Sequence, residues 1–288
     1  MKNTPMVKYK TIIKVIEHYI IKCQPNKKAY TIGESAQVKM STSIDENGEF
    51  EYIDEIRYDD GTILKFNDSH QIMSLEHNNF NAKFMLRHNS YDFFKDQKDK
   101  IIKKYDEDTY KMFESYCDNW ATGKGMIFNQ YLRGEIGKKQ LKKELGAMFP
   151  FMWENYPKFK QICNDINLGD YNDFYTVRYA DNLHNTDSLN RNIIWDKGDT
   201  SATCGFALTE GTIMEGKEVG IFADMGNHWK VITLYKKGNK GHGVFMGNAL
   251  NSKRSTKDWE REIHTPPQQK FRRKIIDIKN KIIIQEPV

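Results

Sequence analysis

The sequence predicts an α+β fold in which a block of helices precedes a block of strands. Apolar residues recur at helical spacing between residues 96 and 166, whereas the chain after Gly169 consists of short runs rich in β-branched and aromatic residues. Segregated blocks of this kind are typical of α+β folds rather than of doubly wound sheets. At 288 residues the chain suits one large or two modest domains. We expect a small α+β module at 1–90 and a larger domain at 91–288.

The first 90 residues combine one helical pattern with several strand patterns. Tyr9–Cys23 has helical periodicity, with Ile12, Ile16 and Ile20 on one face. The Asp59-Asp60-Gly61 triplet is a hairpin signal between two strands. The expected strands are Gln37–Ser43, Phe50–Tyr58 and Thr62–Phe66, and the polar runs Asn78–Asn81 and His88–Ser90 mark the expected boundary.

Helix signals dominate the next 75 residues or so. Asp106 is placed to cap a helix that continues to Trp120, and Gly123–Gly125 interrupts the pattern. The remaining expected helices are Phe128–Leu132, ending at Gly134, and Lys138–Ile166, interrupted near Pro150 and Pro157.

Strand signals fill the rest of the chain. The expected strands are Phe174–Tyr179, Thr203–Leu208, Val219–Ala223, Trp229–Tyr235, Gly243–Met246, Glu260–Thr265, Phe271–Ile278 and Ile282–Gln285.

Composition narrows the classes of function. The four cysteines are scattered without CxxC spacing, so we expect free thiols in a reducing compartment and no metal site, and His228, His242 and His264 also lack metal-ligand spacing. The chain has no signal peptide pattern and no apolar run near the roughly 18 residues of a membrane helix, so we expect a soluble, cytoplasmic protein without membrane contact. The net charge of +5 would help the approach of an acidic ligand such as a dinucleotide, but a solvated, slightly basic surface is the ordinary explanation for it.

The densest cluster of candidate catalytic groups is Glu260-Arg261-Glu262. Residues two apart in a strand share a face, so the two carboxylates are expected to project side by side, with Arg261 on the other face. Neighbouring carboxylates raise each other's pKa and can divide the tasks of stabilising a cation and accepting a proton. Without further context, a charged edge strand is the ordinary explanation for this pattern.

Four segments, in order, resemble the mono-ADP-ribosyltransferases of the Arg-Ser-Glu class. Tyr116 followed by Phe128-Asn129-Gln130-Tyr131-Leu132-Arg133-Gly134 is similar to the helical lead-in of that family, and Phe174–Tyr179 lies where the family has its arginine strand. Trp229–Ile232 followed by Gly238–Gly243 resembles its strand and glycine-rich turn, and Glu260–Phe271, with Pro266-Pro267, resembles its closing region. The resemblance covers about residues 91–288. It implies an ADP-ribosyltransferase-like fold, with two packed β-sheets around an NAD cleft and helices preceding them.

The resemblance also implies roles for individual residues. Arg178, together with Phe206 and Thr209, would bind NAD, because a strand arginine offers a planar, charge-assisted grip on phosphate oxygens. Glu262 would stabilise the oxocarbenium-like state as nicotinamide leaves, and Glu260 would position or deprotonate the acceptor.

The acceptor and the target surface follow from the same resemblance. A glutamate at position 260 is associated in the family with arginine acceptors, and the loop Ala249–Asp258 with Trp259, including Arg254, would meet the target protein. Trp259 is otherwise expected to be a core aromatic residue.

One motif departs from the family pattern. The Ser-Thr-Ser motif is expected after Gly205-Phe206-Ala207, but the chain has Leu208-Thr209-Glu210 there. The first serine normally orients the catalytic glutamate. Thr209, Thr203 and Ser201 remain the alternatives for that role.

The sequence therefore predicts an NAD-consuming enzyme of the phage or bacterial toxin and effector type. It would transfer ADP-ribose to a host or target protein on arginine, in the cytoplasm or in the host cell after delivery. NAD would serve as a substrate, and no metal is required. Residues 1–90 would recognise the target, aid delivery or brace the catalytic domain. The alternatives are an inactive relative that binds a partner through the same loop, and a nucleic-acid-binding or nucleic-acid-modifying protein, which is less favoured.

Overall fold

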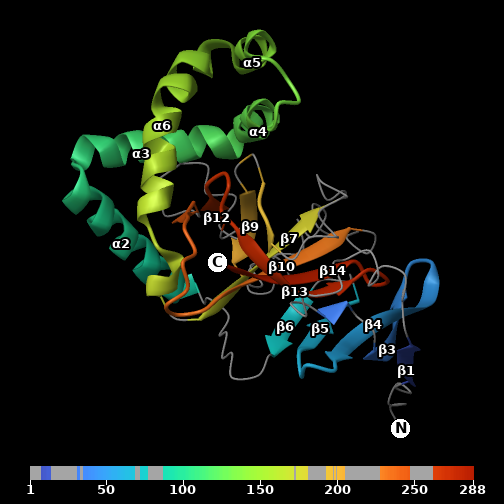
Figure 1. Ribbon diagram of the computed structural model, residues 1–288. Helices are drawn as coiled ribbons and strands as arrows, with labels where there is room; N and C mark the ends of the chain where they lie inside the picture. The colour runs from blue at the N-terminus through green and yellow to red at the C-terminus, as the bar shows by residue number, and fades with distance from the viewer. Residues whose placement is uncertain are drawn as a thin grey trace.

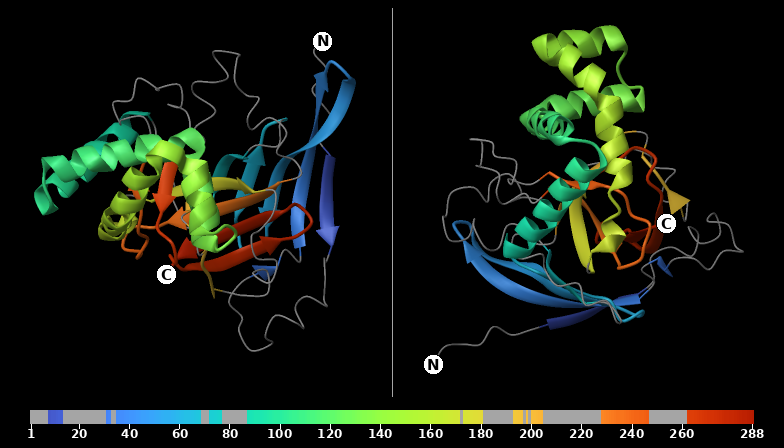
Figure 2. Two further views of the ribbon diagram at one scale, coloured as in Figure 1. Left: turned by 90° about the horizontal axis from the view of Figure 1, so that it is seen from above. Right: turned by 90° about the vertical axis from the view of Figure 1, so that its left-hand side faces the viewer.

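The computed structural model describes residues 8–13, 31–32, 35–68, 72–76, 87–171, 173–180, 193–196, 198, 200–204, 228–246 and 262–288. Within these ranges the α+β class and two packed sheets are confirmed, although the smaller sheet is built from residues 8–76 and not, as expected, from residues 91–288. The larger sheet is the middle layer, with the helices on one side and the smaller sheet on the other (Figures 1 and 2). Among the described residues, no helix is long and apolar enough to cross a membrane.

The strands of the smaller sheet come from the first part of the chain. Their order in the sheet is β1-β3-β4-β5-β6, and every neighbouring pair is antiparallel. Their bounds are β1 Lys8–Ile13, β3 Ser35–Asp45, β4 Gly48–Tyr58, β5 Ile63–Phe66 and β6 Ile72–Glu76.

The larger sheet has nine strands in the order β11-β12-β9-β7-β10-β14-β13-β2, with β8 paired to β13. The β10–β14 and β13–β2 pairs are parallel, and the others are antiparallel. The bounds are β2 Thr31–Ile32, β7 Phe174–Ala180, β8 Ile193–Ile194, β9 Thr200–Cys204, β10 Trp229–Tyr235, β11 Val244–Phe245, β12 Glu262–Thr265, β13 Phe271–Asp277 and β14 Ile282–Pro287.

The helices lie between the two blocks of strands in sequence and form the arm at the upper left of Figure 1. Asp106 caps α3 as expected, accepting a hydrogen bond from the Thr109 amide at 2.6 Å, and Gly134 ends α4 in the left-handed conformation. The bounds are α2 Arg87–Lys104, α3 Glu107–Asn119, the π-helix η1 Trp120–Lys124, α4 Gly125–Arg133, α5 Lys138–Leu145, η2 Gly146–Met148, α6 Phe149–Asp165 and η3 Leu168–Asp170.

Two hydrophobic cores hold the three layers together. The inter-sheet core joins residues of the smaller sheet, such as Ile56 and Leu64, to Val177, Ile232 and Ile284 of the larger sheet. The helical core packs aromatic residues of α3, η1, α4 and α6 against strands β11 and β12 at one end of the larger sheet. The strands near that end therefore meet the helices, whereas the central strands meet the smaller sheet.

The expected helix at Tyr9–Cys23 is wrong over its described part. Lys8–Ile13 is strand β1, which pairs in antiparallel register with β3 from Lys8↔Met40 to Ile13↔Ser35. Tyr, Thr and Ile residues suit a pleated strand, and pairing with a neighbouring strand overrides local helical periodicity. Residues 14–30 lie outside the described part of the chain.

Several other boundaries also differ from expectation. His88–Ser90 lies inside α2 rather than in a linker, and α6 runs through Pro157 without ending there. The strand expected at Thr203–Leu208 is Thr200–Cys204 in its described part, so it begins three residues earlier. Residues 205–227, which include the expected strand Val219–Ala223, lie outside the described residues.

The chain continues through Gly123–Gly125 by a π-helical turn that places Trp120 against Gly125. A Cβ atom at Gly125 would lie 2.3 Å from the indole of Trp120, which is closer than real side chains approach. Trp120 in turn packs on Phe128 and Phe159. We expect Gly125→Ser to lower the free energy of unfolding by about 2 kcal/mol or more, because it overpacks the helical core. A thermal denaturation curve measures this as a fall in melting temperature.

Gly137→Ser is the matched control for this prediction. Gly137 precedes α5 with extended backbone angles and has open space around it. Because serine is a favourable N-cap residue, the same substitution is expected to leave stability unchanged or to raise it slightly. Equal melting temperatures for the two variants would contradict a steric role for Gly125.

Candidate active site

The larger sheet brings the strand of Arg178 and the strand of Glu262 close together. Strand β9 lies between β7 and β12 and pairs with both in antiparallel register. Val177, the neighbour of Arg178, pairs with Thr203, and Thr203 pairs with Glu262. Two strand spacings separate the backbones of Val177 and Glu262 by about 10 Å. Segments 84 residues apart in the sequence (262 minus 178) thus meet at one place in the sheet.

Of the three alternative hydroxyl residues, Thr203 and Ser201 are described, and Thr209 lies outside the described residues. Thr203 is the cross-strand partner of Glu262 on β9, and Ser201 pairs with His264 two residues further along. Directly paired residues in antiparallel strands have Cβ atoms about 5 Å apart. The sequence placed the expected motif after Phe206, whereas the strand that neighbours β12 ends at Cys204.

Arg178 lies beside an ion pair that the sequence analysis did not predict. Arg133, the last residue of α4, donates two parallel hydrogen bonds to Asp196: Nε to Oδ1 and Nη2 to Oδ2, each at 3.1 Å. The Asp196 side chain also accepts from the Gly198 amide at 2.9 Å. Two guanidinium groups and one carboxylate therefore lie near one another where the end of α4 contacts the segment that follows β8.

The charges of this cluster perturb one another. Burial raises the pKa of Asp196, but the hydrogen bonds from Arg133 and the Gly198 amide, with the charges of Arg133 and Arg178, outweigh it and leave that pKa below its ordinary value. Burial lowers the pKa of Arg178, and the positive charge of Arg133 lowers it further, against the opposing effect of Asp196. Because a guanidinium stays protonated at any physiological pH, the three groups carry a net charge of about +1, which favours an anionic ligand.

The backbone around Asp196 is fitted closely to α4. A Cβ atom at Gly198 would lie 2.8 Å from Asn129 Oδ1 and 3.2 Å from Arg133 Nε. The Gln268 amide, from the turn after Pro266-Pro267, donates to the Asp196 carbonyl at 2.9 Å. Asn129 and Arg133 both belong to the helical segment that the sequence analysis singled out, and Gln268 belongs to the closing segment. Residues from two of the segments that resemble the family therefore lie around Asp196.

His264 lies two residues beyond Glu262 in strand β12 and is fully buried. Its ring packs in a T-shaped arrangement against the rings of Trp120 and Phe159, with ring centroids 4.8 and 5.1 Å away. The fixed ring anchors β12 to the helical core close to Glu262.

Several of the predicted site residues lie outside the described part of the chain. These are Glu260, Phe206, Thr209, Trp259 and Arg254. Among the residues that are described, no group of three or more His, Cys, Asp or Glu side chains is arranged to hold a metal ion.

Comparisons with known proteins give only distant matches. No family model and no curated protein matches the sequence. Among solved structures, the ADP-ribosyltransferase Vis in complex with agmatine matches with a TM-score of 0.41 and 15% identity, over 73% of this chain and 89% of that chain. The Vis toxin from Vibrio splendidus gives 0.38 and 14%, over 73% and 89% of the two chains. The enzymatic component C2-I of the C2-toxin from Clostridium botulinum gives 0.38 and 12%, over 88% of this chain and 55% of that one. At this level of similarity the fold and function of this chain rest on its own residues.

Proposed function

We propose that the protein is an NAD-dependent mono-ADP-ribosyltransferase that modifies a target protein on arginine. The observation that carries this proposal is the pairing of β7, β9 and β12, which puts Thr203 between the strand of Arg178 and Glu262. Across the sheet, the strand of Arg178, the strand of Thr203 and the strand of Glu262 follow one another in that order, and this order supports the proposal. In this proposal Thr203 orients Glu262, which is the role of the first serine in the family.

The arginine cluster suits the diphosphate of NAD. Planar guanidinium groups bind phosphate oxygens through paired, charge-assisted hydrogen bonds. Arg178 provides one such group, and Asp196 holds Arg133 beside it in a fixed orientation. Arg133 is therefore a further NAD-binding residue in this proposal, beside Arg178, Phe206 and Thr209.

The reaction needs little beyond this binding site and two carboxylates. The bond between nicotinamide nitrogen and ribose C1′ breaks, and its electron pair leaves with the neutral nicotinamide. The Glu262 carboxylate stabilises the cationic ribose during this step. A guanidinium nitrogen of the target attacks C1′, and the proton that it loses passes to Glu260. NAD is consumed as a substrate, so the step requires neither a metal nor a redox partner.

Residues 91–288 form the catalytic part in this proposal, and residues 1–90 brace it. The smaller sheet supplies about half of the inter-sheet core, and Tyr58 donates a buried hydrogen bond of 2.9 Å to Asp277 of β13. The Tyr179 hydroxyl of β7 accepts from the Ile72 amide at 3.3 Å. The Ile72 contact involves the strand of Arg178 itself, and the Tyr58 contact holds β13 of the same sheet; both support bracing over the other two roles considered for this module.

The test is incubation of the purified protein with NAD labelled in its adenylate phosphate, together with bacterial or eukaryotic lysate. We expect label on a protein band, free nicotinamide in the supernatant, and release of the label by hydroxylamine under conditions that cleave arginine adducts. The absence of both ADP-ribose transfer and NAD hydrolysis would contradict the enzyme assignment and favour a partner-binding protein. Label on nucleic acid instead of protein would correct the acceptor.

A further inference from the structure

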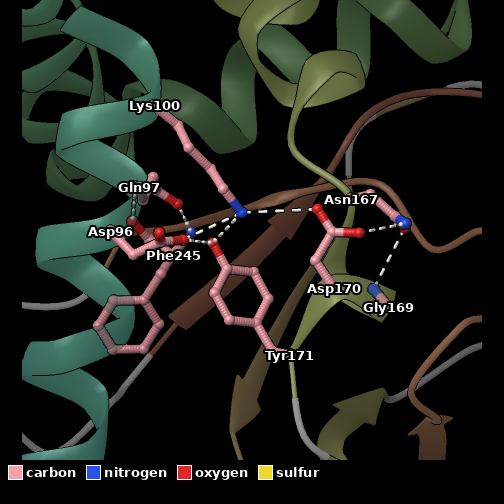
Figure 3. A network of polar contacts seen from close by, with 8 residues as sticks. All are labelled: Asp96, Gln97, Lys100, Asn167, Gly169, Asp170, Tyr171 and Phe245. Carbon is pink, nitrogen blue, oxygen red and sulfur yellow. Dashed lines mark hydrogen bonds and ion pairs between the residues drawn. The ribbon is translucent and has the colours of Figure 1, made fainter. Parts of the chain in front are cut away.

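Gln97 of α2 makes a two-point contact with the backbone of the edge strand β11. Its Nε2 donates to the Phe245 carbonyl at 3.1 Å, and its Oε1 accepts from the Phe245 amide at 2.8 Å. Gln97 is fully buried, and Figure 3 shows its side chain turned toward Phe245. A primary amide offers one donor and one acceptor at its tip, so Gln97 makes the same pair of hydrogen bonds as a neighbouring strand would.

Strand β11 depends on this contact more than a longer strand would. It has only two residues and is the last strand in the order of the larger sheet, with β12 on one side. Phe245 is itself buried, so its amide and carbonyl are shielded from water. A buried backbone amide or carbonyl without a hydrogen-bond partner destabilises the fold. The Gln97 amide removes that destabilisation on the side of β11 that β12 does not cover.

The position of β11 bears directly on Glu262. Phe245 pairs with Ile263, and Val244 pairs with His264. Ile263 is the next residue after Glu262, which pairs in turn with Thr203. A shift of β11 therefore displaces the strand that sets Glu262 opposite its hydroxyl partner.

A separate set of contacts fixes α2 one turn further along. Lys100 Nζ lies 3.0 Å from Asp96, 3.3 Å from the Tyr171 hydroxyl and 3.5 Å from Asp170, at the end of η3 (Figure 3). The same ammonium lies 4.6 Å from the centroid of the Tyr171 ring. Helix α2 is thus tied to η3 by Lys100 and to β11 by Gln97, which makes it a firm support for the edge of the sheet.

We propose that Gln97 is a positioning residue of the active site: it holds β11 in place, so that β12 keeps Glu262 in register with Thr203. This inference rests on the proposed function, because the register of Glu262 affects a rate only if Glu262 takes part in a reaction. Gln97 touches neither the arginine cluster nor Glu262 itself among the described contacts, so its influence passes through the backbone of β11 and β12.

The test compares Gln97→Met, which keeps the length of the side chain and loses both hydrogen bonds, with Leu64→Ala as a matched destabilised control. Leu64 is fully buried in the inter-sheet core, on the far side of the larger sheet. We expect Gln97→Met to lower kcat for NAD consumption by about tenfold to a hundredfold, because small displacements of a catalytic group have effects of this size. The KM for NAD should stay within about twofold, since Arg178 and Arg133 lie on other elements. Leu64→Ala should keep its kcat at temperatures where it remains folded.

Hydrogen exchange of the β12 amides gives a second measurement that needs no enzymatic activity. Faster exchange at Glu262–Thr265 in Gln97→Met, but not in Leu64→Ala, would support the inference. An unchanged kcat in Gln97→Met, or an equal loss in Leu64→Ala, would overturn it. If the wild-type protein consumes no NAD, the proposed function fails, and unchanged exchange in Gln97→Met would then separately overturn the anchoring of β12.

Discussion

Replacing Glu262 by glutamine is expected to lower both NAD hydrolysis and ADP-ribose transfer by about 100- to 1,000-fold. The substitution keeps the size of the side chain and removes the negative charge that stabilises the cationic ribose. Losses of this size are typical when one group that stabilises transition-state charge is removed. Because the change acts on the transition state, kcat is expected to fall while the KM for NAD changes little. Single-turnover assays with labelled NAD measure both quantities.

Two other glutamates serve as matched controls for this change. Glu260→Gln should lose most transfer to arginine and retain NAD hydrolysis, because Glu260 acts on the acceptor in the proposed reaction. Glu76 lies at an exposed position of β6, where its carboxylate is 3.4 Å from the ammonium of Lys65. Glu76→Gln should therefore leave both activities unchanged. Retention of full NAD hydrolysis in Glu262→Gln would contradict the catalytic assignment.

Much of the fold was predictable because its signals are local. The cap at Asp106, the helix end at Gly134 and the hairpin at Asp59–Gly61 each depend on a few adjacent residues. Strand β10 has the bounds that its residue types indicate, Trp229–Tyr235. By contrast, the local pattern at β1 predicts a helix, because its strand character depends on pairing with β3, whose paired residues lie 22 to 32 positions away in the sequence.

The candidate site was predictable in its strands but not in its pairing. The residue types around Arg178 and Glu262 were sufficient to indicate two strands, yet the hydroxyl partner of Glu262 depends on the register of β9 between them. The Arg133–Asp196 pair joins residues 63 positions apart and depends on the tertiary contact between the end of α4 and the segment that follows β8. Arg133 lay inside a motif quoted from the sequence, which was the one available signal, whereas nothing in the local pattern distinguished Asp196 from other surface carboxylates.

Replacing Asp196 by asparagine is expected to destabilise the protein by about 2–3 kcal/mol and to make its stability depend strongly on added anions. The carboxylate accepts two hydrogen bonds from Arg133, and the side chains of the two residues are only 22% and 12% exposed. Removing one partner of a buried pair leaves the other charge uncompensated, here with Arg178 as a like charge nearby. A loss of this size corresponds to a fall in melting temperature of about 5 °C or more in a chain of this length.

Inorganic pyrophosphate is expected to reverse that loss, because an anion between Arg133 and Arg178 replaces the missing negative charge. A ligand at 100 times its dissociation constant contributes about 2.7 kcal/mol, enough to restore the wild-type melting temperature. Asp165→Asn is the matched control, since the Asp165 side chain is also 22% exposed and pairs with Lys104 at 2.7 Å within the helical layer. It should show a smaller loss and no response to pyrophosphate.

The pH dependence of unfolding gives an independent check on the same pair. The pKa of Asp196 is lowered in the folded protein, so its contribution to stability is complete above the unfolded pKa near 4 and disappears as the pH falls through the folded value. The asparagine variant lacks this group, and its stability should therefore converge with that of the wild type in acid. A constant difference in stability between the two proteins from neutral pH down to about pH 2 would show that the charge of Asp196 does not stabilise the fold. Equal effects of pyrophosphate on the Asp196 and Asp165 variants would show that the arginine cluster is not the anion-binding part of the site.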